Sequence, residues 1–501
     1  MEDNNINLTA FGKNDIRGIF PKNINREIFF YTAKGYVNFV LKELKRMNKE
    51  MQPRELLFTV CMDARLHSKE LKNAIIQGVT STGANILDLG LAPTPLGYYS
   101  EFAKIDSEIT ENKKVLGALI VTASHNPSEY NGLKMTFDKK SLSEAQIQEV
   151  KQITQEIYDG STGYRQVITG FSKTYDIISN YQNKIYDMFG SIGKNIKIVV
   201  DSANATGGIV APQLYRDLGC EVVELYSEPD GNFPNHHPNP SEIKTLDEIR
   251  KQVVKEHADF GIAFDGDSDR IGAIAPDGTV ISGDKLLLIY ADDLINTLKI
   301  HGEKPIIVSE VKCSQVLYDT IESLGGIAVM TKTGHGYIKS KMRETGALLA
   351  GEMSGHTFFK DRYYGYDDAI YAGCRLIEIV AKNKQKNPGF KLNELLEPFT
   401  KVYLSDEVRL SCPNEFKKDV LNALEEKINY ELFNSKIKEI ITIDGLRIIF
   451  EDGFALIRQS NTEPVFTLRF EAKTKEKCEH YKDTLVNLTN SLKEQYCAQK
   501  V

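Results

Sequence analysis

Three aspartates at alternate positions follow an apolar run in the middle of the chain, as Asp265-Gly-Asp267-Ser-Asp269-Arg270. Carboxylates spaced in this way on an extended loop point to the same side, so their oxygens can converge on one hard cation. A calcium EF-hand is excluded because its twelfth position would be Pro276 rather than Glu. An aspartate-rich turn is the structural alternative. The triple alternation favours a Mg²⁺ site whose open positions take phosphate oxygens.

A second loop carries a serine beside a histidine. Thr122-Ala-Ser124-His125-Asn126-Pro127 follows the apolar run 115–121. On its own, this pair is also typical of a turn or a helix cap. The chain has neither the Gly-x-Ser-x-Gly elbow of an α/β-hydrolase nor a Walker P-loop. The serine is therefore a candidate phosphate carrier only if the predicted metal lies near it.

The elements that must position both loops follow a repeated pattern of apolar run, small or polar loop, and helical stretch. The apolar runs are 56–62, 115–121, 196–200, 258–264 and 347–350. This pattern predicts α/β units with parallel strands. Because ligands gather at the carboxyl ends of strands in open α/β sheets, chemistry is expected in the loops that follow these runs.

The last hundred or so residues have a different pattern. Residues 446–450 and 454–457 flank Asp452-Gly453 and predict a β-hairpin, which precedes a strand at 465–470 and a charged helix from about Thr474. They predict a small separate α+β domain. A chain of 501 residues predicts roughly three to five domains. Polar stretches near 156–173 and 382–391 are predicted connectors.

The composition excludes several classes of protein. Hydrophobic residues make up 41% and charged residues 26%, which predicts a globular protein. The net charge of −7 offers no general attraction to nucleic acid or to an anionic membrane. The polar, acidic start and the lack of a long apolar run predict neither a signal peptide nor a membrane span. Seven scattered cysteines predict reduced thiols in a cytoplasmic protein, without structural zinc.

Four motifs occur in an order that resembles the α-D-phosphohexomutase superfamily, closest to its bacterial phosphomannomutase/phosphoglucomutase branch. They are the serine loop, the aspartate loop, Gly351-Glu-Met-Ser-Gly-His356 and Arg458-Gln-Ser-Asn-Thr462. The resemblance runs from 14–18 to 470–472, which is nearly the whole chain.

The resemblance implies three related mixed-sheet α/β domains, followed by a smaller α+β domain of the TATA-box-binding-protein-like type, around a central cleft. The implied boundaries are 1–168 for a catalytic phosphoserine domain, 169–282 for a metal-binding domain, 283–398 for a sugar-binding domain and 399–501 for a phosphate-binding domain. The C-terminal domain is expected to close over the cleft when substrate binds.

The resemblance also implies residue roles. Ser124 would be the phosphoserine and, with Asp265, Asp267 and Asp269, a ligand of one Mg²⁺ per chain. The implied catalytic residues are Ser124, His125, Arg17, Lys134, Arg270 and His335, the last as a proton shuttle. The implied substrate-binding residues are Lys312, Gly334, His335, Glu352, Ser354, His356, Arg458, Ser460, Asn461 and Thr462. Without the resemblance, Lys134 reads as a surface charge and 458–462 as a polar turn.

The implied reaction is reversible phosphoryl transfer between the 1- and 6-positions of mannose and glucose phosphates. It would use a phosphoserine enzyme and a hexose 1,6-bisphosphate, which is both intermediate and activator. The expected partners are hexose phosphates alone, with no nucleic acid or membrane, and the chain is expected to be a monomer or a weak homodimer.

Several alternatives stay open. One is a glucose-only phosphoglucomutase or a phosphoglucosamine mutase of the same superfamily. Another is a Mg²⁺-dependent phosphatase, and a third is a non-catalytic sugar-phosphate-binding protein. Asn14, Ala369 and Glu463 depart from the residues common in the branch and leave the sugar preference open.

Overall fold

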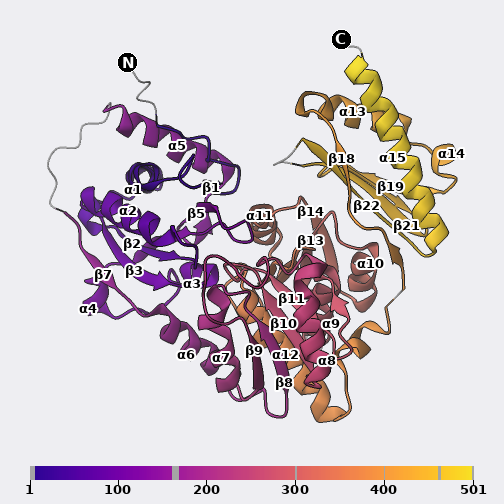
Figure 1. Ribbon diagram of the computed structural model, residues 1–501, viewed down its shortest axis with the longest axis horizontal. Helices are drawn as coiled ribbons and strands as arrows, with labels where there is room; N and C mark the ends of the chain where they lie inside the picture. The colour runs from indigo at the N-terminus through magenta and orange to yellow at the C-terminus, as the bar shows by residue number, and fades with distance from the viewer. Residues whose placement is uncertain (1–5, 161–168, 300–301, 400, 461–463, 499–501) are drawn as a thin grey trace. The chain divides into compact units, whose positions relative to one another are not determined.

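The computed structural model describes residues 6–160, 169–299, 302–399, 401–460 and 464–498. The chain divides into two compact units. Unit 1 comprises 1–282, 354–358 and 366–393, and unit 2 comprises 283–353, 359–365 and 394–501. Three α/β sheets are followed by an antiparallel sheet with its own helices, which confirms the predicted three α/β domains and smaller α+β domain (Figure 1).

The first sheet of unit 1 has the strand order β1-β5-β4-β2-β3-β7, with β6 paired to β5. Its strands are β1 (Ile16–Ile19), β2 (Leu57–Met62), β3 (Asn85–Leu91), β4 (Val115–Val121), β5 (Tyr130–Phe137), β6 (Lys140–Ser141) and β7 (Ser172–Thr174). Its helices are α1 (Arg26–Arg46), the 3₁₀ helix η1 (Pro53–Glu55), α2 (Ser68–Ser81), α3 (Thr94–Tyr99), α4 (Ser107–Thr110) and α5 (Glu144–Tyr158).

Local sequence explains these elements. Strands β2 and β4 are parallel and buried along almost their whole length, as continuous apolar runs predict. Helix α1 begins after Asn25, whose side chain accepts a hydrogen bond from the Ile28 amide, and α5 begins with a capping box at Ser143 and Gln146. Helix α1 packs against both α2 and α5.

The second sheet of unit 1 has the order β12-β11-β10-β8-β9. Its strands are β8 (Lys197–Asp201), β9 (Glu221–Leu225), β10 (Phe260–Phe264), β11 (Ile271–Ile274) and β12 (Val280–Ile281). The helices nearby in the chain are α6 (Ile177–Phe189), η2 (Thr206–Ile209), α7 (Ala211–Asp217), η3 (Ile243–Leu246) and α8 (Asp247–Lys255), and α12 (Ala369–Lys386) joins this unit later. Phe264 pairs with Ile271, so the aspartate loop is a six-residue hairpin between antiparallel strands.

One predicted connector is partly wrong. Residues 382–386 continue helix α12, and only the residues after Lys386 leave it. The helix persists because Lys384 is held by the Asp259 carboxylate at 2.7 Å and by the Asn195 carbonyl at 2.9 Å. The charge-rich residues 382–386 are therefore the solvent-accessible last turn of a helix rather than a linker. The other predicted connector begins inside α5, and residues 161–168 of it lie outside the described residues.

Unit 2 begins with a sheet of order β14-β13-β15-β16, in which β13 is parallel to both β14 and β15. Its strands are β13 (Ile306–Glu310), β14 (Ile327–Thr331), β15 (Leu349–Gly351) and β16 (Thr357–Phe359), and its helices are α9 (Gly283–Lys299), α10 (Gln315–Leu324) and α11 (His335–Thr345). The 3₁₀ helix η4 (Leu392–Leu396) follows α12 in the chain.

The C-terminal sheet has the order β17-β22-β21-β20-β19, with β18 paired to β22, and all these pairs are antiparallel. Its strands are β17 (Tyr403–Leu404), β18 (Val408–Ser411), β19 (Ile437–Ile441), β20 (Leu446–Phe450), β21 (Gly453–Gln459) and β22 (Val465–Ala472), and its helices are α13 (Asn414–Lys427), α14 (Tyr430–Phe433) and α15 (Lys475–Ala498). Figure 1 shows α15 lying along this sheet, where it packs on β21 and β22. The predicted hairpin, strand and final helix are confirmed.

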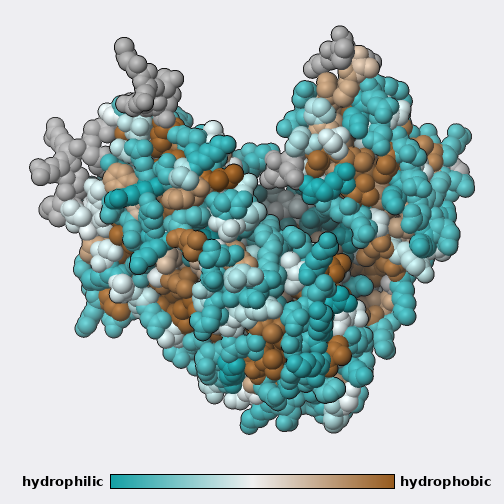
Figure 2. All heavy atoms as spheres, viewed as in Figure 1, coloured by the Kyte–Doolittle hydropathy of each residue, from teal (hydrophilic) through white to brown (hydrophobic). Residues whose placement is uncertain are grey.

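Polar side chains dominate the face drawn in Figure 2, and apolar ones form small separated patches on it. Among the described helices, none combines the length and apolar content that a membrane span requires.

Candidate active site

The serine loop and the aspartate loop meet in unit 1. Ser124, in the connection from β4 to β5, is only 2% exposed, and its Oγ donates a hydrogen bond to Asp265 Oδ2 at 2.7 Å. The two backbones also touch, because a Cβ built on Gly266 would overlap the carbonyl oxygen of Ser124. Glycine is therefore required at 266 for this approach. Residues 141 positions apart are brought into hydrogen-bond contact.

The three aspartates form a buried acidic cluster. One oxygen from each of Asp265, Asp267 and Asp269 lies within 4.8 Å of the others. Burial raises the pKa of Asp265, and the charges of Asp269 and Asp267 raise it further. Asp267 Oδ1 is buried and has no hydrogen-bond partner among the described residues. Carboxylates that repel each other and leave an oxygen unpaired fit a bound divalent cation.

Helix α3 holds the aspartate loop from the first domain. The backbone amide of Thr94, its first residue, donates to the carbonyl of Asp267 at 2.9 Å, and its Oγ1 donates to Asp267 Oδ2 at 2.6 Å. Sequence reasoning missed Thr94. The threonine lies in Pro93-Thr94-Pro95, which carries no signal of its own beyond a helix start.

Lys134 supplies the positive charge nearest to the aspartate cluster. Its Nζ on β5 donates to Asp267 Oδ2 at 2.7 Å and to Asp269 Oδ2 at 2.5 Å. Burial opposes protonation of Lys134, but the two carboxylates outweigh it and hold its pKa well above the ordinary value. For Asp269, burial is outweighed by Lys134, His356 and Arg270 together, which hold the pKa of that carboxyl well below its ordinary value. The residue that resembled a surface charge is a buried one.

Arg17 and Arg270 add two guanidinium groups to the cluster. On β1, Arg17 donates to the Asn126 side chain at 2.8 Å and to Asp15 at 2.5 Å. Arg270 ends the aspartate loop, and its Nε lies 3.9 Å from Asp265 Oδ2. His125 follows Ser124 in the chain, and its Nδ1 lies 3.1 Å from Ser124 Oγ.

His125 is electrically neutral near pH 7. Burial lowers its pKa, and the nearby Arg270 and Arg17 charges lower it further. A neutral imidazole beside the serine hydroxyl can accept or donate a proton there.

His356 and Ser354 lie in unit 1 with this cluster. His356 Nε2 lies 3.2 Å from Asp269 Oδ1 and 3.3 Å from Arg270 Nε, while its Nδ1 lies 3.1 Å from Ser354 Oγ. His356, Asp269 and Asp367 form a second group whose ligand atoms lie within 4.8 Å of one another. Because the two groups share Asp269, they belong to one polar centre.

Unit 2 gathers other predicted residues at the carboxyl ends of β13, β14 and β15. Glu352 Oε1 accepts a hydrogen bond of 2.6 Å from the Gly334 amide, and His335 is the first residue of α11. Lys312 Nζ lies 3.4 Å from Glu310 Oε1, which also accepts from the Met353 amide at 3.1 Å.

Two positioning residues of unit 2 were missed by sequence reasoning. Glu310, at the end of β13, links Lys312 to the loop of Glu352. Arg447, fully buried on β20, donates to the carbonyls of Val311 and Cys313, on either side of Lys312. No local pattern distinguishes these two residues from other strand residues.

Arg458 stands at the end of β21, and its Nε donates to Asp444 Oδ2 at 3.0 Å. The same carboxylate oxygen accepts from the Thr333 amide at 3.2 Å, so Asp444 connects Arg458 to the loop that contains His335. Ser460 follows, with its carbonyl held by Lys417 Nζ at 3.1 Å. Asn461 and Thr462 lie outside the described residues.

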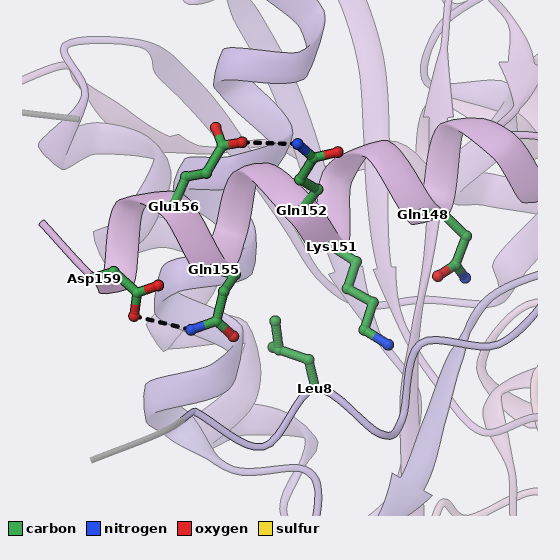
Figure 3. Close-up of a pocket in the computed structure, with 7 residues that line it drawn as sticks. All are labelled: Leu8, Gln148, Lys151, Gln152, Gln155, Glu156 and Asp159. Carbon is green, nitrogen blue, oxygen red and sulfur yellow. Dashed lines mark hydrogen bonds between the residues drawn. The ribbon is translucent and has the colours of Figure 1, made fainter. Parts of the chain in front are cut away.

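A separate hollow runs along α5 in Figure 3. Leu8 forms part of it, and side chains along the helix pair with each other, Gln152 with Glu156 and Gln155 with Asp159. None of its lining residues is a predicted site residue.

The geometry of unit 1 defines a class of protein. A buried serine hydroxyl lies against carboxylates able to hold a divalent cation, and three basic side chains surround it. These are the groups that transfer of a phosphoryl group to and from a serine requires.

Comparisons with known proteins agree with that class. Four family models match in order, described as phosphoglucomutase/phosphomannomutase alpha/beta/alpha domain I at 8–161, domain II at 179–278, domain III at 282–402, and the C-terminal domain at 407–488. The chain therefore belongs to the phosphoglucomutase/phosphomannomutase family.

Individual relatives cover almost the whole chain. It is 36% identical over 479 residues to a phosphomannomutase/phosphoglucomutase of Pseudomonas aeruginosa, covering 96% of this chain and 95% of the relative. It is 37% identical over 471 residues to a phosphoglucomutase of Neisseria meningitidis serogroup A, covering 94% of each. A crystal structure of a phosphoglucomutase/phosphomannomutase family protein from Burkholderia thailandensis matches with a TM-score of 0.84 and 33% identity, over 97% of this chain and 98% of that one.

Proposed function

We propose that this chain is a phosphohexomutase that moves a phosphoryl group reversibly between the 1- and 6-positions of a hexose phosphate, with Ser124 as the covalent carrier. The observation that carries the proposal is the contact of Ser124 Oγ with Asp265 inside a buried group of three carboxylates that also binds the buried Lys134. Phospho-Ser124 gives its phosphoryl group to the free hydroxyl of the sugar, which becomes a hexose 1,6-bisphosphate. After the sugar turns round, Ser124 takes back the other phosphate.

The carboxylates of Asp265, Asp267 and Asp269, with the Ser124 oxygen, would hold one Mg²⁺. When bound, the ion neutralises charge on the phosphoryl oxygens. A set of protein donors made only of oxygen atoms favours Mg²⁺ over softer metals. The remaining work falls to side chains of this chain.

Basic groups offset the charge that builds up during transfer. Lys134, Arg17 and Arg270 are the groups proposed to contact the transferring phosphoryl oxygens, since positive charge stabilises a loose transition state. Neutral His125, 3.1 Å from Ser124 Oγ, is placed to exchange a proton at that oxygen. His335 is the proposed proton shuttle on the sugar side.

Unit 2 provides the proposed grip on the rest of the substrate. Lys312, Gly334, His335 and Glu352 would bind sugar hydroxyls, with Ser354 and His356 of unit 1. Arg458, Ser460, Asn461 and Thr462 would bind the phosphate that is not reacting, because a guanidinium with hydroxyl and amide donors suits phosphate. A grip on the ring and on a distant phosphate can serve both orientations of the sugar.

Several finer points belong to the proposal. The substrates are mannose and glucose phosphates, as the names of two relatives suggest. Hexose 1,6-bisphosphate activates the enzyme by phosphorylating Ser124. The domain boundaries at 168, 282 and 398, the cytoplasmic location and a monomer or weak homodimer stay predictions.

Replacement of Ser124 by alanine tests the carrier directly. The wild-type chain incubated with glucose 1,6-bisphosphate should gain one phosphate by intact-mass measurement, and Ser124→Ala should not. Mutase activity should fall by at least about 10⁴-fold, as for the loss of other enzymes' nucleophiles. The control is Ser128→Ala, an exposed serine of the same loop, which should keep both properties. Unchanged turnover in Ser124→Ala would dispose of the proposal.

A Mg²⁺-dependent phosphatase is separated by its product. A phosphatase releases free phosphate at a rate comparable with isomerisation, whereas a mutase isomerises with little release. Specificity constants for mannose, glucose and glucosamine 1-phosphates, measured side by side, then rank the sugars.

A further inference from the structure

We propose that Arg65 is a positioning residue that fixes the conformation of the Ser124 loop, and so sets the rate of phosphoryl transfer without touching substrate. The inference deepens the proposed function and rests on Ser124 being the carrier. The inference comes from the hydrogen bonds that the Arg65 side chain, just after β2, makes along the loop that carries Ser124.

The guanidinium of Arg65 donates to four backbone carbonyls of the connection between β4 and β5. Nη2 binds the carbonyl of Ser124 at 2.8 Å and that of Asn126 at 2.5 Å. Nη1 binds the carbonyl of Pro127 at 2.5 Å and that of Tyr130 at 3.1 Å. One side chain therefore anchors the loop at its serine, its middle and its end.

The remaining donor is anchored by Asp63. Arg65 Nε donates to Asp63 Oδ2 at 3.1 Å, and that oxygen also accepts from the Ala123 amide at 3.3 Å. Asp63 Oδ1 accepts from Ser68 Oγ at 2.5 Å and from the Arg65 amide at 3.1 Å. The carboxylate thus joins the guanidinium to the residue immediately before the serine.

Arg65 has no room to move elsewhere. Its side chain is 0% exposed, and the ring of Phe233 covers the guanidinium at 5.4 Å. A Cβ on Gly231 would collide with the backbone at Ala64 and Leu66, so the covering segment lies directly on this turn. Burial lowers the pKa of Arg65, against the opposing charge of Asp63. An arginine stays charged at neutral pH even so.

The serine needs this support because its backbone is strained. Ser124 has φ of +50°, in the left-handed region that non-glycine residues adopt at a cost of about 1 kcal/mol or more. Its carbonyl is held by Arg65 on one side while its Oγ is held by Asp265. Two fixed points on one residue define the direction in which the hydroxyl projects.

The same contacts affect the electrostatic field at the Ser124 hydroxyl. A carbonyl that accepts from Arg65 cannot also face a phosphoryl oxygen, so repulsive dipoles of the loop are turned away from the proposed site. In a trans peptide, N–H and C=O point in opposite directions, so the His125 amide points away from Arg65. Lysine cannot reproduce the arrangement, because it has three donors at one point rather than five in a planar fork.

The test compares Arg65→Lys and Arg65→Met with Lys72→Met. Lys72 is a buried cation of the same domain, on α2, paired with Asp88, so its loss controls for the removal of a buried charge. In Arg65→Met, kcat should fall about 100-fold with KM changed less than about threefold, since small misplacement of a reacting group carries that cost. Arg65→Lys should lose about tenfold in kcat. Lys72→Met should lower Tm but keep kcat.

Single-turnover phosphorylation of Ser124 by glucose 1,6-bisphosphate, followed by intact mass, adds a readout that lowered stability does not move. Its rate should fall in parallel with kcat in both Arg65 variants, measured well below their Tm. If Arg65→Met does not fold, Arg65→Lys decides the matter. The inference is overturned if Arg65→Lys keeps the wild-type kcat. It is also overturned if Arg65→Lys loses no more kcat than Lys72→Met does when the two variants have equal Tm.

The outcome is separable from that of the proposed function. Inactive Ser124→Ala with fully active Arg65 variants refutes only the positioning role. Active Ser124→Ala refutes the carrier, and the Arg65 inference falls with it.

Discussion

The ion pairs of Lys134 in unit 1 are more deeply buried than those of Lys312 and Arg458 in unit 2. In unit 1, Lys134, Asp267 and Asp269 have side chains 6%, 1% and 1% exposed, and each is bound to another member of the set. In unit 2, Lys312 is 20% exposed and lies 3.4 Å from its carboxylate, and the pair of Arg458 and Asp444 is 10% and 18% exposed.

The difference would suit the two tasks that we propose. A phosphoryl group crosses one fixed point, and fixed charges shielded from water stabilise its transition state without reorganisation. A sugar that must bind in two orientations is better served by groups that can reach water and exchange partners. We therefore expect substitutions of Lys134 and the three aspartates in unit 1 to act on kcat, and those of Lys312 and Arg458 in unit 2 to act on KM.

The largest effect should come from Asp267→Asn. This substitution removes one charge from the proposed metal site and one partner of Lys134, so we expect mutase activity to fall about 10³-fold. Titration calorimetry with Mg²⁺ should show weaker binding. Asp277→Asn changes an exposed aspartate in the turn after β11 and should alter neither quantity. Full activity in Asp267→Asn would end the assignment of unit 1 to chemistry.

A smaller effect is expected from Arg458→Met in unit 2. Loss of the proposed charged contact with phosphate should raise KM about 10- to 100-fold, with kcat within about threefold of wild type. Arg409→Met removes an arginine of β18 whose side chain is 47% exposed, and steady-state kinetics should show no change. A fall in kcat at constant KM in Arg458→Met would contradict the division of tasks.

Much of this arrangement was predictable from the sequence. The ends of β4 and β10 were predicted to the residue, because continuous apolar runs stop abruptly at Thr122 and Asp265. The carboxyl-end rule for α/β sheets then predicted that the loops which follow them carry chemistry. The order of motifs predicted the family, which the comparisons confirm.

The parts that were not predicted depend on contacts between distant segments. Arg65 comes soon after a predicted strand, and this position indicated a site. Nothing in Asp63-Ala-Arg65 shows that the Arg65 guanidinium reaches a carbonyl 59 residues away. Arg447 lies inside a strand whose other residues are apolar, and its carbonyl partners, Val311 and Cys313, lie in the turn after β13. Such roles depend on tertiary packing, which local periodicity does not encode.

The smallest expected effect concerns Glu101, a buried carboxylate of unit 1 whose surroundings differ from those of the aspartates bound by Lys134. Glu101 is a 6% exposed carboxylate with no ion pair in the part of the chain that the structure describes, held by Thr136 Oγ1 and by the Lys139 amide. Burial raises its pKa to about 7, despite these hydrogen bonds. The folded protein therefore keeps a proton that the unfolded chain releases above about pH 4.3.

This linkage predicts a pH dependence of stability. As pH rises from about 4.3 to about 7, the free energy of unfolding should lose up to about 4 kcal/mol from this group, and no more is lost above that range. Glu101→Gln should lack this loss, so its advantage over wild type in urea unfolding should be larger at pH 8 than at pH 5, with mutase activity unchanged. Parallel curves for the two proteins would show that Glu101 is ionised throughout, and that unit 1 tolerates a buried charge without a cation.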